Sequence, residues 1–256
     1  MLKDDYSGKL WSFPMPTKAH TQIFKIVRSF ERHIQRRYNL HLCILKHDGE
    51  KGVIAIQGMT EYQRWAENEG IEIQISPAYT HEPNGGPERA GQEVITRALK
   101  MSKHANLPEE LWPEATSAAT KLINMSPSQA QRFKSPNEVL DEWFVLNEDH
   151  YSPSAVRSIQ ADLRPDWSGI YVFGCKAFTL LQDRAAGMDR RAFKVQNRAQ
   201  IGYLVGYVAS NIYRIWLPRH GKVIQTRDVT FDETQFYKGN EETRIEPEVL
   251  ECLKFR

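Results

Sequence analysis

Apolar residues recur at helical spacing near the start of the chain. Residues 6–13 contain a short apolar stretch, which predicts a strand or the arm of a hairpin. A helix is expected from Thr17 onward, because apolar residues then return every three or four positions and define one buried face. That face consists of Ile23, Val27, Phe30, Ile34 and Tyr38.

Short apolar runs alternate with further helical patterns up to Phe144. HLCILKHD (residues 41–48) reads as a buried strand, and IEIQIS (71–76) alternates as a second one. Four further helices are predicted. One covers residues 59–69, and a second begins after the loop of the NGGPER segment and ends at about Asn106. The other two cover residues 107–127 and residues 135–144. Strand–helix–strand–helix alternation predicts an α/β layer with some parallel pairing.

The character of the sequence changes after Phe144. A polar stretch with two prolines reads as a linker, and four strand-like segments punctuated by Gly, Asn and Pro follow it. These segments (IYVFGCKAFTLL, AQIGYLVGYVA, IYRIWLP and KVIQTRDVTFD) predict a small all-β barrel, whose aromatic residues are expected in its core rather than stacked on bases. The expected division is a core over 1–144, a linker over 145–165, the barrel over 166–234 and a charged tail over 235–256.

The composition narrows the class of protein without defining its function. Hydrophobic residues make up 41% of the chain and six are tryptophans, which is enough for a folded core. The net charge of +2 means that any basic surface is local. The three cysteines do not have the spacing of a zinc module, and Cys175 is expected to be a buried barrel residue. The absence of a long apolar run and of a cleavable signal fits a soluble intracellular protein without a membrane partner.

Two acidic residues lie at positions that suit a metal site. Asp48 ends the strand-like run 41–48, and Glu88 lies in the first turn of the helix after Pro87. A sheet that brings this strand end near this helix start would hold both carboxylates around one Mg²⁺ ion. On spacing alone a structural explanation is stronger, because Asp-Gly is common in turns and the helix dipole favours Glu in a first turn.

The helix after Glu88 carries a row of basic residues. Arg89, Arg97, Lys100 and His104 fall within an arc of about 80° on a helical wheel. Such a row would bind phosphates, although a solvated helix face is the more frequent explanation. The same two interpretations apply to the basic residues of the first helix, which are Lys18, Lys25, Arg28, Arg32 and Arg36.

Several longer motifs give the chain a specific resemblance. The segment from SPAYTHEPNGGPERAGQ to ATKLINMSP (residues 76–127) resembles the second half of the integrase core of copia-type retrotransposon polyproteins, of the kind found in fungal genomes. Within it, Asn84-Gly85 and Glu88-Arg89 match that family's NGxxER element. DDYSGKLWSFPMPTK is similar to an earlier segment of the same core, and VFGCKAF, GYLVGY and YRIWLP are similar to the SH3-like barrel that follows it. The resemblance extends in order over residues 2–234.

The resemblance implies an α/β RNase H-like fold, incomplete because its first strand is not among the matched segments, followed by a small all-β SH3-like barrel. It also implies Mg²⁺- or Mn²⁺-dependent DNA strand transfer, in which three carboxylates hold two metal ions. Asp48 matches the second acid and Glu88 the third. The residues expected to bind nucleic acid are Asn84, Arg89, Arg97 and Lys100. The implied partner is DNA, both element ends and target, with RNA as an alternative and a homo-oligomer as the expected assembly.

Two departures from the family pattern change the functional expectation. The common Thr-Asp-Asn-Gly is replaced by His47-Asp48-Gly49-Glu50. The family's first acid lies upstream of the DDYS segment, and Asp4 and Asp5 match the later segment instead. The chain is therefore expected to be an integrase-like polyprotein fragment that is inactive in strand transfer, nuclear if functional and otherwise cytoplasmic. The alternatives are a non-catalytic nucleic-acid- or protein-binding module and a non-functional element remnant, so enzyme status stays open.

Overall fold

A computed structural model describes the chain except residues 18, 49–59, 77–84, 148–162, 181–198 and 240–256. The chain forms two compact units, one made of Met1 with Phe13–Gln92 and the other of Leu2–Ser12 with Glu93–Arg256. The helix α3 (Gly85–His104) runs through the division between them. The domain boundaries expected near residues 144, 165 and 234 stay predictions.

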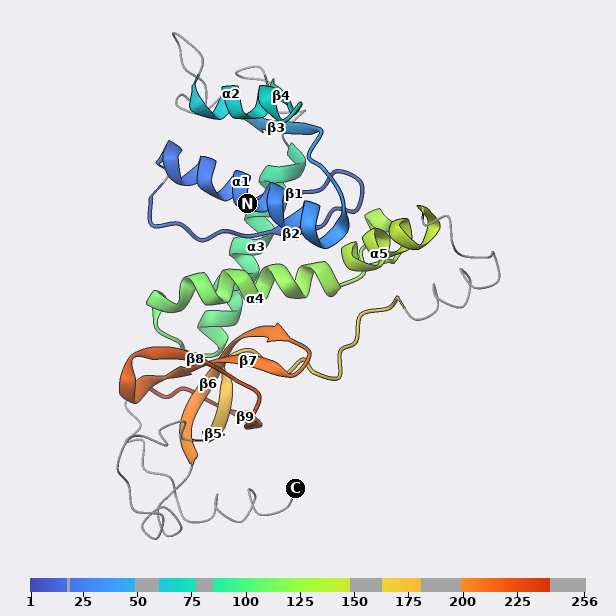
Figure 1. Ribbon diagram of the computed structural model, residues 1–256. Coiled ribbons are helices and arrows are strands. Elements are labelled where there is room, and N and C mark those ends of the chain that lie inside the picture. The colour runs from blue at the N-terminus through green and yellow to red at the C-terminus, as the bar shows by residue number, and fades with distance from the viewer. Residues whose placement is uncertain (18, 49–59, 77–84, 148–162, 181–198, 240–256) are drawn as a thin grey trace, which may run out of the picture. The chain divides into compact units, whose positions relative to one another are not determined.

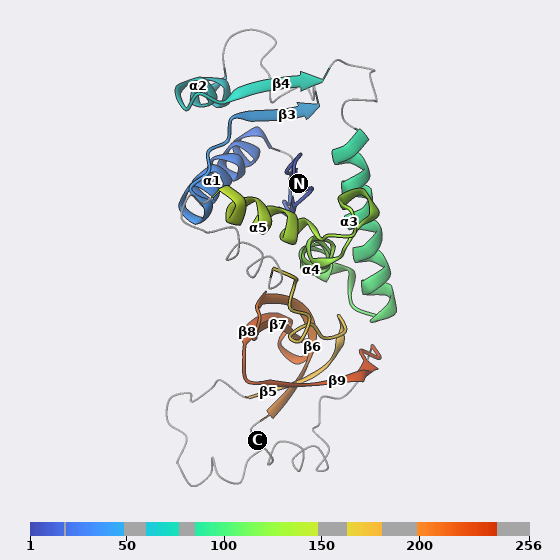
Figure 2. The same cartoon turned by 90° about the vertical axis from the view of Figure 1, so that its right-hand side faces the viewer.

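The first unit is a small α/β layer. It contains α1 (His20–Tyr38), β3 (Ile44–Asp48), α2 (Glu61–Asn68) and β4 (Glu72–Ser76). The two strands pair in parallel, as the alternation of elements predicts, and Figure 2 shows them side by side and pointing the same way. Apolar side chains from both helices cover one face of the strand pair. This core contains Val27, Leu45, Tyr62, Trp65, Ala66 and Ile71, with Ile23, Phe24, Leu42 and Ile73 packed against it.

Local sequence signals explain where these helices begin and end. In α1 the predicted apolar face is confirmed, since Val27, Phe30 and Ile34 are buried. The helix stops at Asn39, which takes the left-handed conformation with φ 53° and donates its backbone N–H to Gln35 O. At the start of α2, Thr60 and Gln63 form a reciprocal capping box that satisfies two backbone N–H groups.

The second unit begins with helices and a short hairpin. Its elements are β1 (Leu2–Lys3), β2 (Leu10–Trp11), η1 (Glu109–Leu111), α4 (Trp112–Met125), η2 (Gln129–Gln131) and α5 (Pro136–Asn147), together with most of α3. The predicted hairpin is present but is shorter than the apolar stretch suggests. Tyr6 lies in its turn and is exposed, whereas Leu10 is buried. The predicted start of α5 is confirmed, because Ser135 and Glu138 exchange side-chain-to-backbone hydrogen bonds.

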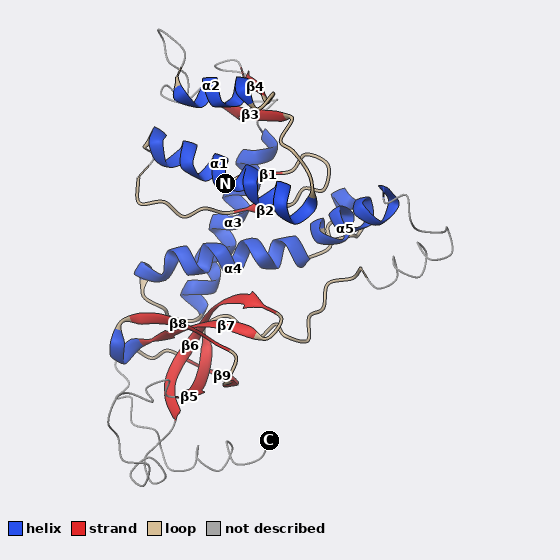
Figure 3. Ribbon diagram, in the orientation of Figure 1, coloured by secondary structure: helices blue, strands red, loops and turns tan. Residues whose placement is uncertain are grey.

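The described strands between Cys175 and Phe236 form one five-stranded antiparallel sheet, which is called the barrel below (Figure 3). Its strands are β5 (Cys175–Leu180), β6 (Ala199–Ala209), β7 (Ile212–Leu217), β8 (Lys222–Thr226) and β9 (Val229–Phe236), in the order β8-β7-β6-β5-β9, with η4 (Pro218–His220) between β7 and β8. The predicted order of an α/β part followed by a small all-β part is thus confirmed. KVIQTRDVTFD is two strands rather than one, because the chain turns at Arg227–Asp228.

The aromatic residues of the barrel lie in or against its core, as predicted. Tyr203 is 1% exposed, and Tyr213 and Trp216 are buried as well. Tyr207 is half-buried and donates its hydroxyl hydrogen to Tyr171 O at 2.6 Å. Because burial keeps most of their ring surfaces away from solvent, these rings are not a platform for stacking bases.

The barrel and the helices of the second unit are joined by polar contacts. Arg214 of β7 donates to a carboxylate oxygen of Glu114 on α4 at 2.8 Å. On the same helix, the Lys121 ammonium lies 5.3 Å from the centre of the Tyr207 ring, and burial lowers the pKa of this lysine. These contacts fix the face of α4 that the barrel covers.

Cys175 is expected to resist alkylation in the folded protein. Its side chain is fully buried, and burial with nearby Glu233 and Asp232 raises the pKa of the thiol to about 12. Only about 10⁻⁴ of the thiol is then ionised near pH 8, and the thiolate is the reactive form. Peptide mapping after iodoacetamide treatment should find exposed Cys43 modified and Cys175 modified only in denaturant. Comparable native rates at the two positions would contradict this assignment.

Candidate functional site

Asp48 occupies the last position of β3, at the carboxyl edge of the strand pair. The parallel register places it directly beside Ser76, the last residue of β4. Neighbouring strands lie about 4.8 Å apart, so Asp48 and the point where the chain leaves β4 are immediate neighbours. The Asp48 side chain itself lies outside the described residues.

Glu88 is the fourth residue of α3 and is exposed in its first turn. It makes no hydrogen bond or ion pair with the described residues, and the helix dipole favours a negative charge at this end. On the helical wheel it lies within about 20° of Ile95 and Leu99. These two side chains are 57% and 54% exposed, so Glu88 shares an open face of α3.

The connection between these two acids is only partly described. Residues 77–84, which lead from Ser76 to α3, lie outside the described residues, and so does the predicted ligand Asn84. Within the described part, no group of three or more His, Cys, Asp and Glu residues could hold a metal ion. Convergence of Asp48 and Glu88 on one ion therefore stays a prediction.

The predicted basic row of α3 also contains an acidic residue, Glu93, which the sequence analysis did not include. Glu93 lies about 40° from Arg89 and from Arg97 on the helical wheel, in the middle of the predicted arc. Its carboxylate accepts a hydrogen bond from Arg97 at 2.7 Å. Arg89 and Lys100 are exposed. The row is thus less positive than predicted, and its role in nucleic-acid binding stays a prediction.

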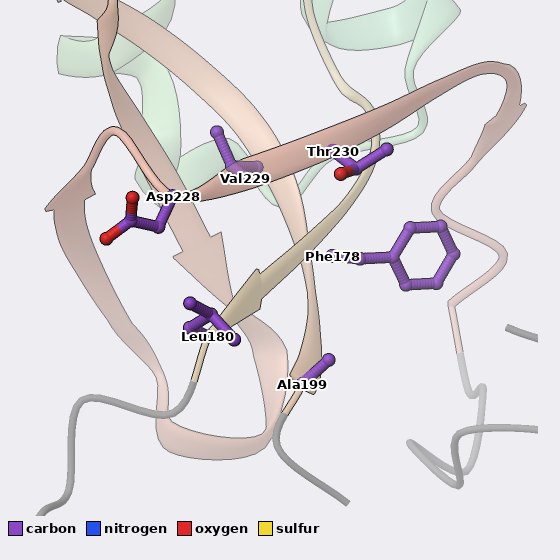
Figure 4. Close-up of a pocket in the computed structure, with 6 residues that line it drawn as sticks. All are labelled: Phe178, Leu180, Ala199, Asp228, Val229 and Thr230. Carbon is purple, nitrogen blue, oxygen red and sulfur yellow. The ribbon is translucent and has the colours of Figure 1, made fainter. Parts of the chain in front are cut away.

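A pocket of about 210 Å³ lies in the barrel, and none of the predicted site residues lines it (Figure 4). It is lined by Phe178, Leu180, Ala199, Asp228, Val229 and Thr230. Leu180 and Ala199 are the last described residues on either side of the segment 181–198. Its lining is largely apolar with Asp228 as its acid, which does not suit a phosphate-binding site.

Comparison with known proteins first defines the class of the β-barrel. Residues 175–245 match the family model described as retroviral polymerase SH3-like domain. This match agrees with the five-stranded antiparallel sheet of the structure and starts at the first residue of β5.

Curated relatives extend the comparison to nearly the whole chain. The chain is 27% identical to the retrovirus-related Pol polyprotein from transposon TNT 1-94 of Nicotiana tabacum. The aligned region is 233 residues long and covers 91% of the chain. It is 22% identical to the corresponding polyproteins from transposons RE2 and RE1 of Arabidopsis thaliana, over 91% and 95% of its length. The chain spans only 15%, 14% and 14% of these three polyproteins.

A solved structure was also found among the similar proteins. A chain in the cryo-EM structure of the simian T-cell lymphotropic virus intasome in complex with PP2A regulatory subunit B56 gamma has a TM-score of 0.44 and 13% identity. That match covers 87% of this chain and 67% of the viral one.

The chain is similar to a segment of copia-type retrotransposon Pol polyproteins, which confirms the resemblance found in the motifs. The relatives named above are from plants, so the fungal origin stays a prediction. Among the described helices, none has the length and apolar character needed to cross a membrane.

Proposed function

We propose that the chain is an integrase-type DNA-binding segment in which Asp48 and Glu88 hold a divalent metal ion. The observation that best supports this metal site is the parallel register of β3 and β4. It puts Asp48 beside the last residue of β4, and the next described element along the chain is α3, with Glu88 in its first turn. This is the edge at which α/β sheets commonly place their functional groups.

The residues at this edge fit a hard cation. Carboxylates are ligands that Mg²⁺ and Mn²⁺ accept, and Glu88 is exposed and carries no partner among the described residues. When bound, such a metal would polarise a phosphodiester and activate a water or a DNA 3′-hydroxyl. The contribution of the chain is to place the two carboxylates and to hold the DNA beside them.

Strand transfer by this chain alone is not expected. The resemblance identifies two of the three acids that hold the metals in integrases, and catalytic metals must be positioned within a fraction of an ångström. A different chain that carries the missing strand and supplies the third carboxylate would be needed for the reaction. Since its DNA partners are chromosomal target and element ends, the site of action would be the nucleus.

Calorimetric titration with Mn²⁺ or Mg²⁺ tests the metal site. Binding should be weakened at least about tenfold in Asp48→Asn and in Glu88→Gln, because each removes one charged ligand. Matched controls are Asp228→Asn and Glu110→Gln, exposed acids that are not part of the proposed site, and these should bind like the parent. Parent-like binding in either ligand variant, or no binding in the parent, would contradict the site.

A non-catalytic DNA-binding module is the second candidate function. It is favoured by an exposed row of cations on α1, which needs no metal to attract phosphates. A parent chain that binds DNA in EDTA but shows no metal binding would support this candidate over the first.

A further inference from the structure

Helix α1 presents four exposed cations on one face. Lys25, Arg28, Arg32 and Arg36 follow each other at spacings of three and four residues and lie within an arc of about 80°. All four side chains are exposed, and none of them makes an ion pair with the described residues. The four residues, called the α1 row below, extend along about 16 Å of helix at 1.5 Å per residue.

The rest of α1 fixes the direction in which this row points. Val27, Phe30 and Ile34 are buried on the opposite side, so the helix cannot rotate without exposing them. The only acidic residue of α1, Glu31, is also buried and lies 3.7 Å from His41 Nδ1. The α1 row is therefore uninterrupted by negative charge, unlike the row on α3 that contains Glu93.

We propose that the α1 row binds the phosphate backbone of double-stranded DNA, an inference that rests on the proposed DNA-binding function. Phosphates of one strand advance by about 3.4 Å along the duplex axis while they wind around it, so the four long side chains of a row of about 16 Å can each reach a phosphate of the same backbone. Arginine side chains donate to phosphate oxygens in a bidentate manner, and three of the four cations are arginines.

The surroundings of the row favour a duplex over other anionic partners. Membrane-surface helices insert an apolar face, but the large apolar residues of α1 are not among the exposed ones. Single strands are bound by stacking bases on exposed aromatic rings, and Phe24 and Phe30 contact other aromatic rings of the first unit. Charge without stacking groups suits sequence-independent contact with a phosphate backbone.

Salt-dependent binding of duplex DNA tests the α1 row. The full chain is titrated in EDTA against a fluorescent duplex of about 20 base pairs at salt concentrations from about 50 to 200 mM, and log K is plotted against log salt. Changing all four residues of the row to glutamine should reduce the slope by about 3 to 4, since each phosphate contact contributes about 0.9. Glutamine keeps the helix propensity, so circular dichroism should be unchanged.

A pair of single variants separates the row from the overall charge. Arg32→Gln, in the middle of the row, should lower the slope by about one. Arg37→Gln removes the same charge from the same helix, but Arg37 points about 100° away from Arg36 and lies over the Tyr38 ring. This control should keep the parent slope.

Three outcomes would overturn the proposal. If the parent binds the duplex and the fourfold variant keeps its slope, DNA binding stands and the α1 row is not the contact. If Arg37→Gln reduces the slope as much as Arg32→Gln, only the net charge matters. If the parent binds phosphatidylserine vesicles but no duplex, both this inference and the proposed DNA-binding function fail.

Discussion

Replacing Gly174 with alanine is expected to lower the free energy of unfolding of the second unit by about 2 to 5 kcal/mol. Gly174 precedes β5 with φ at 81°, a left-handed conformation that costs an L-residue about 1–2 kcal/mol. A Cβ atom there would also lie 2.1 Å from the Cβ of Ala105, a fully buried residue after α3. The backbone must move to relieve this overlap, and overpacking of this kind costs a further 1–3 kcal/mol.

The expected loss is large relative to the stability of a typical domain, which is about 5–15 kcal/mol. Urea titration followed by near-UV circular dichroism measures it. Gly221→Ala is the matched control, because Gly221 also has a positive φ but a Cβ there meets nothing within 4 Å. It should lose only the conformational part, about 1–2 kcal/mol.

A double mutant isolates the steric part of the effect. Ala105→Gly removes the methyl group that a Cβ at position 174 would strike, so Ala105→Gly with Gly174→Ala should be more stable than the sum of the two single losses. Additive losses of unfolding free energy in the double mutant, or equal losses in Gly174→Ala and Gly221→Ala, would show that Gly174 does not pack against Ala105.

The order of elements was predictable because their signals are local. The face of α1 follows from residues three and four apart, and the start of α5 follows from Ser135-Pro136. The break between β8 and β9 was missed, because Arg227 and Asp228 lack the glycine or asparagine that marks most tight turns. The exposure of Tyr6 was missed too, since an aromatic residue beside other apolar residues reads as part of a strand.

The candidate site was predictable only in part, because the pairing of its strands is not a local signal. The position of Asp48 at a strand end could be read from the sequence, but its pairing with Ser76 depends on register, which a sequence does not state. The acid within the α3 row could have been found, because Glu93 lies four residues before Arg97, the spacing of a helical ion pair. Counting basic positions without the acids among them overestimates a phosphate-binding face.

Long-range polar contacts are the part of the fold that no local pattern reveals. Asn124 belongs to the LINMSP segment and is buried near the end of α4. It accepts a hydrogen bond from the backbone N–H of Leu10 at 2.9 Å and donates one to the Leu10 carbonyl at 2.8 Å. A single side chain thus satisfies both backbone groups of a buried residue 114 positions away. It thereby anchors the β1–β2 hairpin to α4.

Replacing Asn124 with alanine is therefore expected to cost about 2–4 kcal/mol of unfolding free energy, because it leaves the N–H and carbonyl of Leu10 buried without partners. Asn147→Ala is the matched control: Asn147 is exposed and donates to Trp143 O within its own helix, so its loss should stay within about 0.5 kcal/mol. Urea titration of both variants gives the comparison.

Asn124→Asp separates lost hydrogen bonds from lost volume. It is nearly isosteric, yet the ionised carboxylate cannot donate to the Leu10 carbonyl and is repelled by it, whereas the protonated acid can donate. Folding therefore raises the pKa of the introduced carboxyl above its unfolded value, and the penalty relative to the parent should be smallest below the unfolded pKa and grow as pH rises through the folded one. A penalty that is independent of pH, or no greater for Asn124→Ala than for Asn147→Ala, would mean that Asn124 fills space rather than pairing with Leu10.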